Sequence, residues 1–359
     1  MSQNKRLPEK GENLSRRKFM RDGAVAAAGL AVGLSAIGTG DAEARVPKAV
    51  RKTRSYNPEM EYRRLGKTGL WVSAVCLGGH WKRVGVMKQD FDQNRHDVVS
   101  RCIDAGINYI DACWGPEVIA YAKTLRGRRD KMYMALSNGG KEVRFKEYRT
   151  AKKLMESLDQ LLKDSKQEYT DLWRITCLEP GGRHTFNTAS EIAKAMDKAK
   201  KQGKARHTGI SSHDRRWIKF MIEYFPTVEV LVFPYTARSK VLPKDSLFET
   251  IQKCDVGAFG IKPFASASLF KGTSAPNDPH FEEDNRKARL AVRHILCNPA
   301  ITAPIPGLIS PQQVDNMVTA VKERRKLDLA EAGELGKAMD EAWANLPDNY
   351  QWLKNWEYV

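Results

Sequence analysis

The chain has 359 residues, and its 60 Lys and Arg outnumber 43 Asp and Glu, which gives a formal net charge of +17 at pH 7. This length suits one large barrel domain, and the charge alone fits an anionic cofactor, a membrane surface or a nucleic acid. The sequence has no zinc-finger spacing, recognition-helix pattern or aromatic RNA-binding motif, which excludes nucleic acid as the expected partner, and its six single cysteines have no metal-ligand spacing, so no metal site is expected.

The N-terminus resembles an export signal. The segment Ser15-Arg-Arg-Lys-Phe-Met20 matches the twin-arginine pattern and precedes a Gly- and Ala-rich run that ends near a small-x-small cleavage site, Ala42-Glu-Ala44. The run is too weakly hydrophobic for a stable membrane anchor. We therefore predict a signal peptide over residues 1–44, the twin-arginine export machinery as a partner, and a periplasmic or otherwise extracytoplasmic location. A basic tail beside an alanine-rich helix is the alternative interpretation.

A basic linker over residues 45–59 precedes a repeated strand–helix pattern. Apolar runs of strand length lie at 74–77, 108–112, 131–136, 170–175, 205–210, 229–233, 257–262 and 301–306. Helical segments fall between or after them, near 92–105, 116–126, 144–164, 187–202, 213–224, 245–253, 283–297 and 311–323. Eight such units predict an α/β fold, a (β/α)8 TIM barrel over residues 60–325.

Segments at either end of the barrel complete the predicted architecture. Residues 60–72 are expected to form an N-terminal hairpin that closes the barrel bottom, and residues 326–359 a helical and aromatic C-terminal extension that packs on the barrel. The charged stretch over 141–149 is expected to lie on a solvated outer helical face.

Reactive side chains follow several predicted strands where the strands end. In a parallel barrel these ends share one mouth, where chemistry takes place. We therefore predict that His80, Asp111, Cys177 and Lys262 converge there as catalytic candidates.

Each candidate also has a purely structural interpretation. His80 is equally consistent with a capped loop residue, and Asp111 with a structural ion pair to Lys262 or Arg174. Three interpretations are open for Cys113 and Cys177: a disulfide between them, nucleophilic thiols, or inert buried thiols.

The loop over 178–184 adds a further pair of candidates. It contains Glu179 and His184, which are able to supply an acid and a base, although the loop is equally consistent with a plain surface connection.

Several motifs occur in the order found in one enzyme family. They are Tyr62-Arg-Arg-Leu-Gly-Lys-Thr-Gly-Leu-Trp-Val-Ser73, Leu77-Gly-Gly79, Gly106-Ile-Asn-Tyr-Ile-Asp111, Gly127-Arg-Arg-Asp-Lys131, Tyr169-Thr-Asp-Leu172, Gly203-Lys-Ala-Arg-His-Thr-Gly-Ile-Ser211 and Ile305-Pro-Gly307. Together they resemble the aldo-keto reductases. The resemblance implies a small-molecule substrate and an NAD or NADP site across the C-terminal face of the barrel.

The family's catalytic residues are mostly replaced. The resemblance implies a Tyr proton donor, a Lys that lowers its pKa, a His that orients the substrate, and an Asp paired with the Lys. Asp111 keeps the Asp, whereas Trp114 stands for the Tyr, Ser137 for the Lys and Thr176 for the His. An indole N–H donates hydrogen bonds but does not release its proton near neutral pH. The sequence thus predicts a known scaffold with an altered acid/base site.

The resemblance also implies where a nicotinamide nucleotide would bind. Ser211 and Ser212 take the place of the pair that holds the nicotinamide amide, while Lys262 and Phe264 match the seventh-strand contacts to phosphate and ring.

Residues near the predicted last strand would contact the far end of the nucleotide. Gly307 lies in the matching dinucleotide turn, and Asn316 resembles the adenine contact with a register uncertain by one residue. Ile309 occupies a place where many relatives have a basic residue for the 2′-phosphate.

Three functions remain open from the sequence. The first is an exported oxidoreductase with a nicotinamide nucleotide and a non-standard acid/base site. The second is a non-catalytic barrel that binds a nucleotide, a sugar or a protein partner, and the third is a lyase or isomerase using Asp111, His80 and Lys262.

Overall fold

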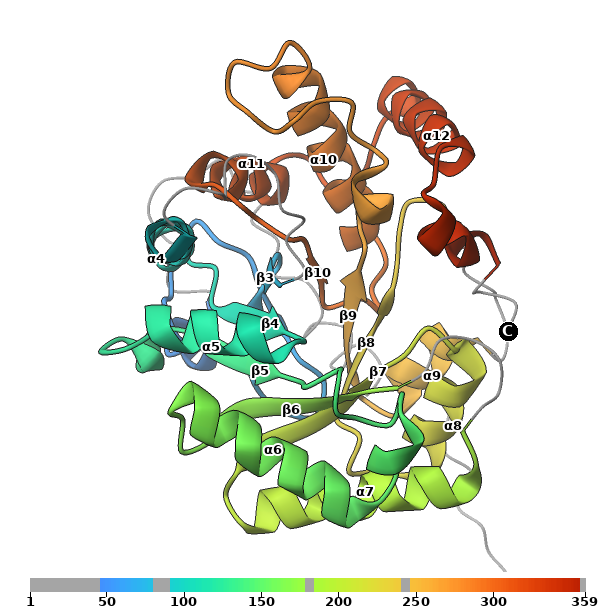
Figure 1. Cartoon of the computed structure of the whole chain (residues 1–359). Helices are drawn as coiled ribbons and strands as arrows, with labels where there is room; N and C mark the ends of the chain where they lie inside the picture. Colours follow the sequence, from blue (N-terminus) through green and yellow to red (C-terminus); the bar gives the residue numbers. More distant parts are fainter. Residues whose placement is uncertain (1–45, 80–90, 178–183, 240–245, 356–359) are drawn as a thin grey trace, which may run out of the picture. The chain divides into compact units, whose positions relative to one another are not determined.

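The computed structural model describes residues 46–79, 91–177, 184–239 and 246–355. Its centre is an eight-stranded parallel sheet in the order β3 to β10, surrounded by helices (Figure 1). The strands are β3 Leu77–Gly78, β4 Tyr109–Ala112, β5 Tyr133–Leu136, β6 Thr170–Thr176, β7 Ala205–Ser211, β8 Val230–Pro234, β9 Gly257–Ile261 and β10 Ala303–Ile305. The predictions for residues 1–45, His80 and Glu179 lie outside the described residues.

The first and last strands meet and close the barrel. The backbone N–H of Cys76 donates to the carbonyl of Pro304 at 3.1 Å, and that of Gly78 donates to the carbonyl of Pro306 at 2.8 Å. The predicted TIM barrel is therefore confirmed, and all eight strand C-termini open on one mouth.

Helices follow the strands as the sequence pattern predicts. They are α4 Phe91–Asp104, α5 Gly115–Thr124, α6 Ala151–Ser165, α7 Phe186–Lys201, α8 Arg215–Tyr224, α9 Leu247–Lys253, α10 Phe281–Leu296 and α11 Pro311–Lys322. One predicted boundary is wrong: the helix expected from 144 begins at 151. The Thr150 side chain accepts a hydrogen bond from the Lys153 N–H and so caps α6, while only a short 3-10 turn, η3 Lys146–Tyr148, precedes it.

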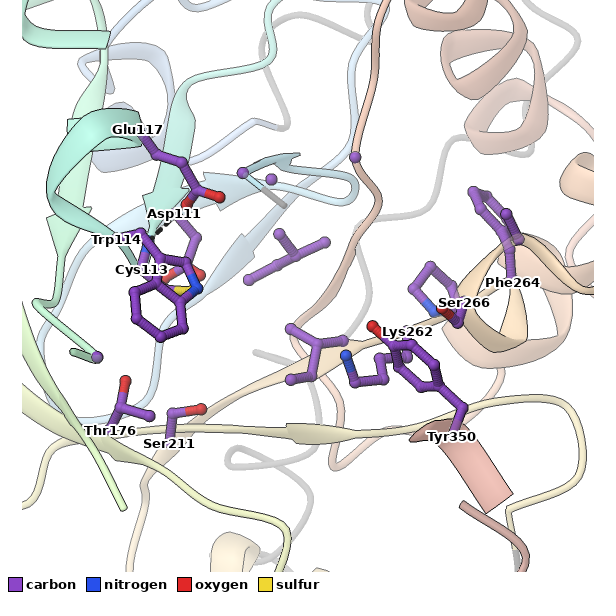
Figure 2. A pocket seen from close by; sticks show the side chains of 18 of the residues that line it. Asp111, Cys113, Trp114, Glu117, Thr176, Ser211, Lys262, Phe264, Ser266 and Tyr350 are labelled. Atoms are coloured by element: carbon purple, nitrogen blue, oxygen red, sulfur yellow. Dashed lines mark hydrogen bonds between the residues drawn. The ribbon is translucent and has the colours of Figure 1, made fainter. Parts of the chain in front are cut away.

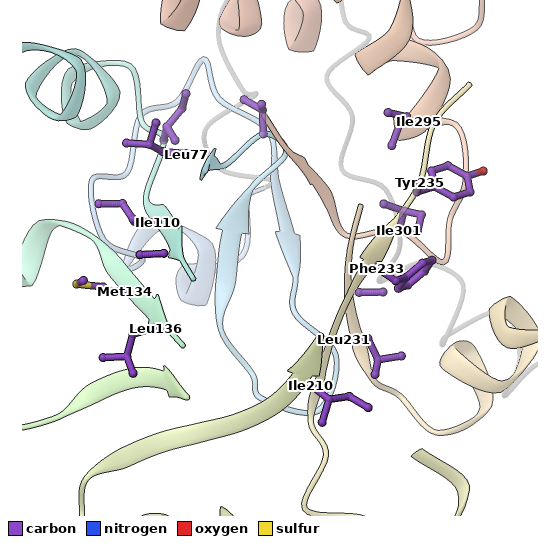
Figure 3. Packing of buried hydrophobic residues seen from close by; sticks show 14 of the residues in the cluster. Leu77, Ile110, Met134, Leu136, Ile210, Leu231, Phe233, Tyr235, Ile295 and Ile301 are labelled. Carbon is purple, nitrogen blue, oxygen red and sulfur yellow. The ribbon is translucent and has the colours of Figure 1, made fainter. Parts of the chain in front are cut away.

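Alternation along the strands separates two apolar layers. Residues of one parity fill the barrel interior, where the rings of Tyr109 and Phe259 lie 4.5 Å apart. Residues of the other parity, among them Ile110 and Leu231, pack in the layer shown in Figure 3. Because side chains alternate, Asp111 shares the interior-facing parity of Tyr109 and lies at the mouth end of its strand.

An antiparallel hairpin precedes the barrel, as predicted. Its strands are β1 Tyr62–Arg64 and β2 Trp71–Ser73, and Gly66 in the turn contacts the barrel through a bridge to Val256. Gly66 has φ +49°, and a Cβ there would lie 2.3 Å from the backbone nitrogen of Gly257, so only glycine fits.

A helical extension follows the barrel. Helix α12 Leu329–Ala344 leads to η5 Asp348–Lys354. The buried Arg293 of α10 holds α12 through hydrogen bonds of 2.8 and 2.9 Å to Glu331. Among the residues described, no helix has the length and apolar character needed to cross a membrane.

Candidate functional site

A cavity of about 400 Å³ opens at the C-terminal mouth of the barrel. Side chains from several strand ends, from the loop after β9 and from η5 line it (Figure 2). The lining residues include Asp111, Cys113, Trp114, Glu117, Arg174, Thr176, Cys177, Ser211, Ser212, His213, Lys262, Phe264, Gly307, Ile309, Tyr350 and Trp352. The volume lies within the range of small-molecule sites.

A buried ion pair lies at the base of this cavity. Arg174 donates from Nε to Asp111 Oδ1 and from Nη2 to Asp111 Oδ2, each at 2.6 Å. Burial opposes the charged form of Arg174, but the charge and hydrogen bonds of Asp111 outweigh it and raise the guanidinium pKa. Of the two partners that the sequence left open for Asp111, the structure selects Arg174, not Lys262.

Two of the three replaced positions, Ser137 and Thr176, touch each other beside that ion pair. Their hydroxyl oxygens lie 2.6 Å apart, and Arg174 Nη1 donates to Thr176 Oγ1 at 3.2 Å. Ser137 in turn donates to the Glu142 carboxylate at 2.6 Å. Thr176 lines the cavity, whereas Ser137 and Glu142 lie behind it.

Glu142 corrects one sequence expectation. It belongs to the charged stretch expected on a solvated face, yet it is 1% exposed. The reason is that its carboxylate accepts backbone N–H groups from Asn138 and Thr176, which draws the loop after β5 inward. Burial raises the Glu142 pKa, although these hydrogen bonds, that from Ser137 and the charge of Arg174 oppose the shift.

The cavity thiols are poor nucleophiles. In the described part of the chain, Cys113 and Cys177 are not joined by a disulfide, and burial raises the pKa of each to about 12. Because the thiolate is the reactive form, both side chains stay protonated near neutral pH. This chemistry favours the inert interpretation of Cys177.

A strained loop follows β9 on the other side of the cavity. Lys262, Ala265, Ser266 and Ala267 all have positive φ, between 49° and 69°. Residues other than glycine rarely adopt this backbone conformation, and several such residues close together are typical of functional loops. The loop presents the Lys262 ammonium and the Phe264 ring to the cavity.

The C-terminal extension contributes aromatic rings to the same mouth. Trp352 stacks on His213 with ring centroids 3.9 Å apart, and the Lys262 ammonium lies 4.8 Å from the Tyr350 ring centroid. Figure 2 shows Tyr350 beside Lys262, across the cavity from Trp114. These rings therefore form part of the cavity wall on the Lys262 side.

The structure brings most predicted site residues to one cavity. Lining it are Asp111, Cys177, Lys262, Ser211, Ser212, Phe264 and Gly307. His80 lies outside the described residues. Asn316 of α11 is not among the lining residues; its side chain bonds Arg289 and the backbone of Asn285.

The described end of the 178–184 loop does not supply the expected base. The His184 ring lies 4.9 Å from that of Trp217, and burial, with the charge of Arg149, lowers its pKa to about 4. His184 is not among the residues lining the cavity, and Glu179 lies outside the described residues. In the described part of the chain, no three His, Cys, Asp or Glu side chains are grouped to hold a metal ion.

Sequence reasoning missed two acidic residues at or behind the mouth. The sequence did not indicate that Glu142 is buried, because the stretch around it is rich in charged residues. Glu117 accepts the Cys113 backbone N–H at 3.0 Å and fills the space that a Cβ on Gly79 would need. The Gly78-Gly79 pair was the available signal for such a close approach.

Comparisons with known proteins agree with this architecture. A model of the aldo/keto reductase family matches residues 75–289. An L-galactose dehydrogenase from Arabidopsis thaliana is 25% identical over an alignment of 299 residues, which covers 76% of this chain and 91% of that protein.

Two solved structures share the fold. The holo form of an aldo-keto reductase from Bacillus halodurans has a TM-score of 0.60 at 22% identity, covering 78% of this chain and 96% of its own. An aldo-keto reductase from Klebsiella pneumoniae in complex with NADPH has a TM-score of 0.59 at 18% identity, with coverage of 77% and 94%.

Proposed function

We propose that this chain, which belongs to the aldo/keto reductase family, is an oxidoreductase that binds a nicotinamide nucleotide at the barrel mouth and acts on a small carbonyl or hydroxyl compound. One observation carries the proposal: a single cavity is lined by Ser211, Lys262 and Gly307 together with Asp111. The two named relatives, an L-galactose dehydrogenase and a reductase in complex with NADPH, support this class of reaction.

The lining residues suit such a nucleotide chemically. Lys262 would face the phosphates, the hydroxyls of Ser211 and Ser212 would hold the carboxamide, and Phe264 would contact a ring. When bound, the nucleotide supplies or accepts the hydride. The buried Ile309 lines the cavity without offering a charge to a 2′-phosphate, so we expect NAD(H) to bind at least as well as NADP(H).

The acid/base chemistry would differ from that of a Tyr-dependent reductase. Trp114 lines the cavity but cannot give up its indole proton near neutral pH. Asp111 accepts hydrogen bonds from Arg174 through both of its oxygens and anchors the site.

A nucleotide titration tests the proposal. The purified protein is mixed with NADH or NADPH, and energy transfer from protein tryptophans to the reduced nicotinamide is followed. We expect saturable binding of at least one nucleotide in the micromolar range, and turnover with some small carbonyl compounds or sugars but not with the general aldehydes that Tyr-dependent enzymes reduce. No binding of either nucleotide at millimolar concentration would contradict the proposal.

A non-catalytic binding barrel is the second candidate function. It is favoured by the placement of Tyr350 and Trp352 within the mouth and by the replaced catalytic positions. Tight nucleotide or sugar binding without hydride transfer to any tested substrate would support it.

The proposed location is extracytoplasmic, through the twin-arginine route. The proposal is supported by Ser15-Arg-Arg-Lys-Phe-Met20 and the Ala42-Glu-Ala44 site. Changing Arg16 and Arg17 together to lysine is expected to abolish appearance of the processed protein outside the cytoplasm, as measured by fractionation and immunoblotting. The matched control is Arg6→Lys, which leaves the motif intact. Unchanged export of the double variant would contradict this route.

A further inference from the structure

Glu142 is a buried carboxyl group connected to the cavity through hydroxyl groups. Its oxygen Oε2 accepts from Ser137 Oγ at 2.6 Å, and Ser137 Oγ lies 2.6 Å from Thr176 Oγ1. Thr176 lines the cavity. Two hydroxyl groups therefore connect the Glu142 carboxyl group to the cavity in which a substrate would bind.

The donors and acceptors along this hydrogen-bonded series, Glu142, Ser137 and Thr176, determine which group donates in each hydrogen bond. Ser137 has one hydroxyl proton, and while it donates that proton to ionised Glu142, Thr176 must be the donor to Ser137. When Glu142 is protonated, its proton on Oε2 goes toward Ser137, and both hydroxyl bonds reverse. The Thr176 hydroxyl proton then points to the cavity. Each state keeps every group in the chain hydrogen-bonded.

We infer that the Glu142–Ser137–Thr176 chain is the proton relay of this site and delivers the proton to the substrate oxygen during carbonyl reduction. The inference rests on the proposed function. As hydride from the nicotinamide nucleotide adds to the carbonyl carbon, the C=O π pair moves to oxygen, which takes the Thr176 proton. Thr176 is refilled from Ser137, and Ser137 from Glu142, which becomes a carboxylate. The product is an alcohol, and after it leaves, Glu142 regains a proton from the cavity solvent through Thr176 and Ser137; oxidation runs the steps backwards.

The surroundings of Glu142 suit both of its protonation states. Burial raises its pKa, which keeps the acid form available closer to neutral pH. The carboxylate left after proton transfer is held by the N–H groups of Asn138 and Thr176 and faces the positive charge of Arg174. The Cys177 thiol, directly after β6, also interacts with this carboxyl group and stays protonated.

Removing one hydroxyl should interrupt the relay without changing nucleotide binding. Thr176→Val and Ser137→Ala are expected to lower kcat for carbonyl reduction by about 10²–10⁴-fold while the nucleotide Kd stays within a factor of about two. Thr176→Ser keeps the hydroxyl and should restore most of the rate. Thr250→Val, which removes a buried hydroxyl on α9, is the matched control and should retain full activity.

A readout without turnover tests the source of the proton. Infrared difference spectra of wild type minus Glu142→Gln, recorded without ligand across pH, should show the protonated carboxyl of Glu142 persisting above the ordinary glutamate pKa of about 4.3. For carbonyl reduction, kcat should fall as the pH rises through the same titration, because the relay starts from protonated Glu142. In Ser137→Ala, the carboxyl frequency should shift because its hydroxyl partner is gone.

The two proposals fail in different ways. A wild-type protein that binds no nucleotide would overturn the proposed function. A wild type that binds and reduces, together with an unimpaired Thr176→Val variant or a Glu142 that titrates at its ordinary pKa, would overturn the relay alone.

Discussion

A variant with Arg174 replaced by methionine should unfold with a free energy about 3–5 kcal/mol lower than the wild type. The substitution leaves the Asp111 carboxylate in the barrel with neither of its 2.6 Å hydrogen bonds. Asp111 and Arg174 are 5% and 3% exposed, so water from the cavity replaces the lost partner only in part. An uncompensated buried charge, not the loss of a contact as such, is the source of the effect.

Urea unfolding followed by circular dichroism measures this loss, provided that the m-values of the two proteins agree. The double variant Asp111→Leu with Arg174→Met removes both charges and should recover most of the stability. The control Arg286→Met breaks an exposed pair with Glu334 and should change stability by less than about 1 kcal/mol. If Arg174→Met were equally mild, the pair would not be the electrostatic anchor of the site.

The barrel was predictable because its signals are local and repeated. Each strand is a short apolar run whose neighbours in sequence are also its neighbours in the sheet. The start of α6 was not predictable from the sequence. The charged stretch before it has helical composition, and only the Thr150 cap shows where the helix begins.

The site was partly predictable for the same reason. Residues such as Asp111 and Ser211 end strands, so topology alone brings them together. Strand parity also places Arg174 inside the barrel, since it shares the face of Leu172 and Thr176. Sequence could not choose between Arg174 and Lys262 as the partner of Asp111.

Glu142 lay beyond sequence reasoning. A glutamate in a charged loop is ordinarily solvated, and its burial depends on backbone N–H groups contributed by two different strand ends. Such contacts follow from loop geometry that no periodic pattern encodes. The same holds for Tyr350 and Trp352, which the sequence placed against the barrel without indicating that they line its mouth.

Replacing Lys262 with methionine should weaken nicotinamide nucleotide binding by about 10–100-fold, the loss expected for charged hydrogen bonds of about 1.5–3 kcal/mol. Lys262 is held at φ +58° in the strained loop after β9, which fixes where its ammonium enters the cavity. At rest, that ammonium lies against the Tyr350 ring. Phosphate oxygens offer it a stronger partner than an aromatic face does.

Titration of both proteins with NADH at several salt concentrations measures the effect, because a phosphate contact weakens with ionic strength and its loss should flatten that dependence. Lys152→Met removes the same charge from an 84% exposed side chain on α6 and should leave affinity unchanged. Unaltered folding of Lys262→Met, checked by circular dichroism, excludes a structural cause. Equal affinity in Lys262→Met and wild type would mean that the phosphates lie elsewhere. A mouth lined by Tyr350 and Trp352 would then fit a non-catalytic barrel better than a reductase.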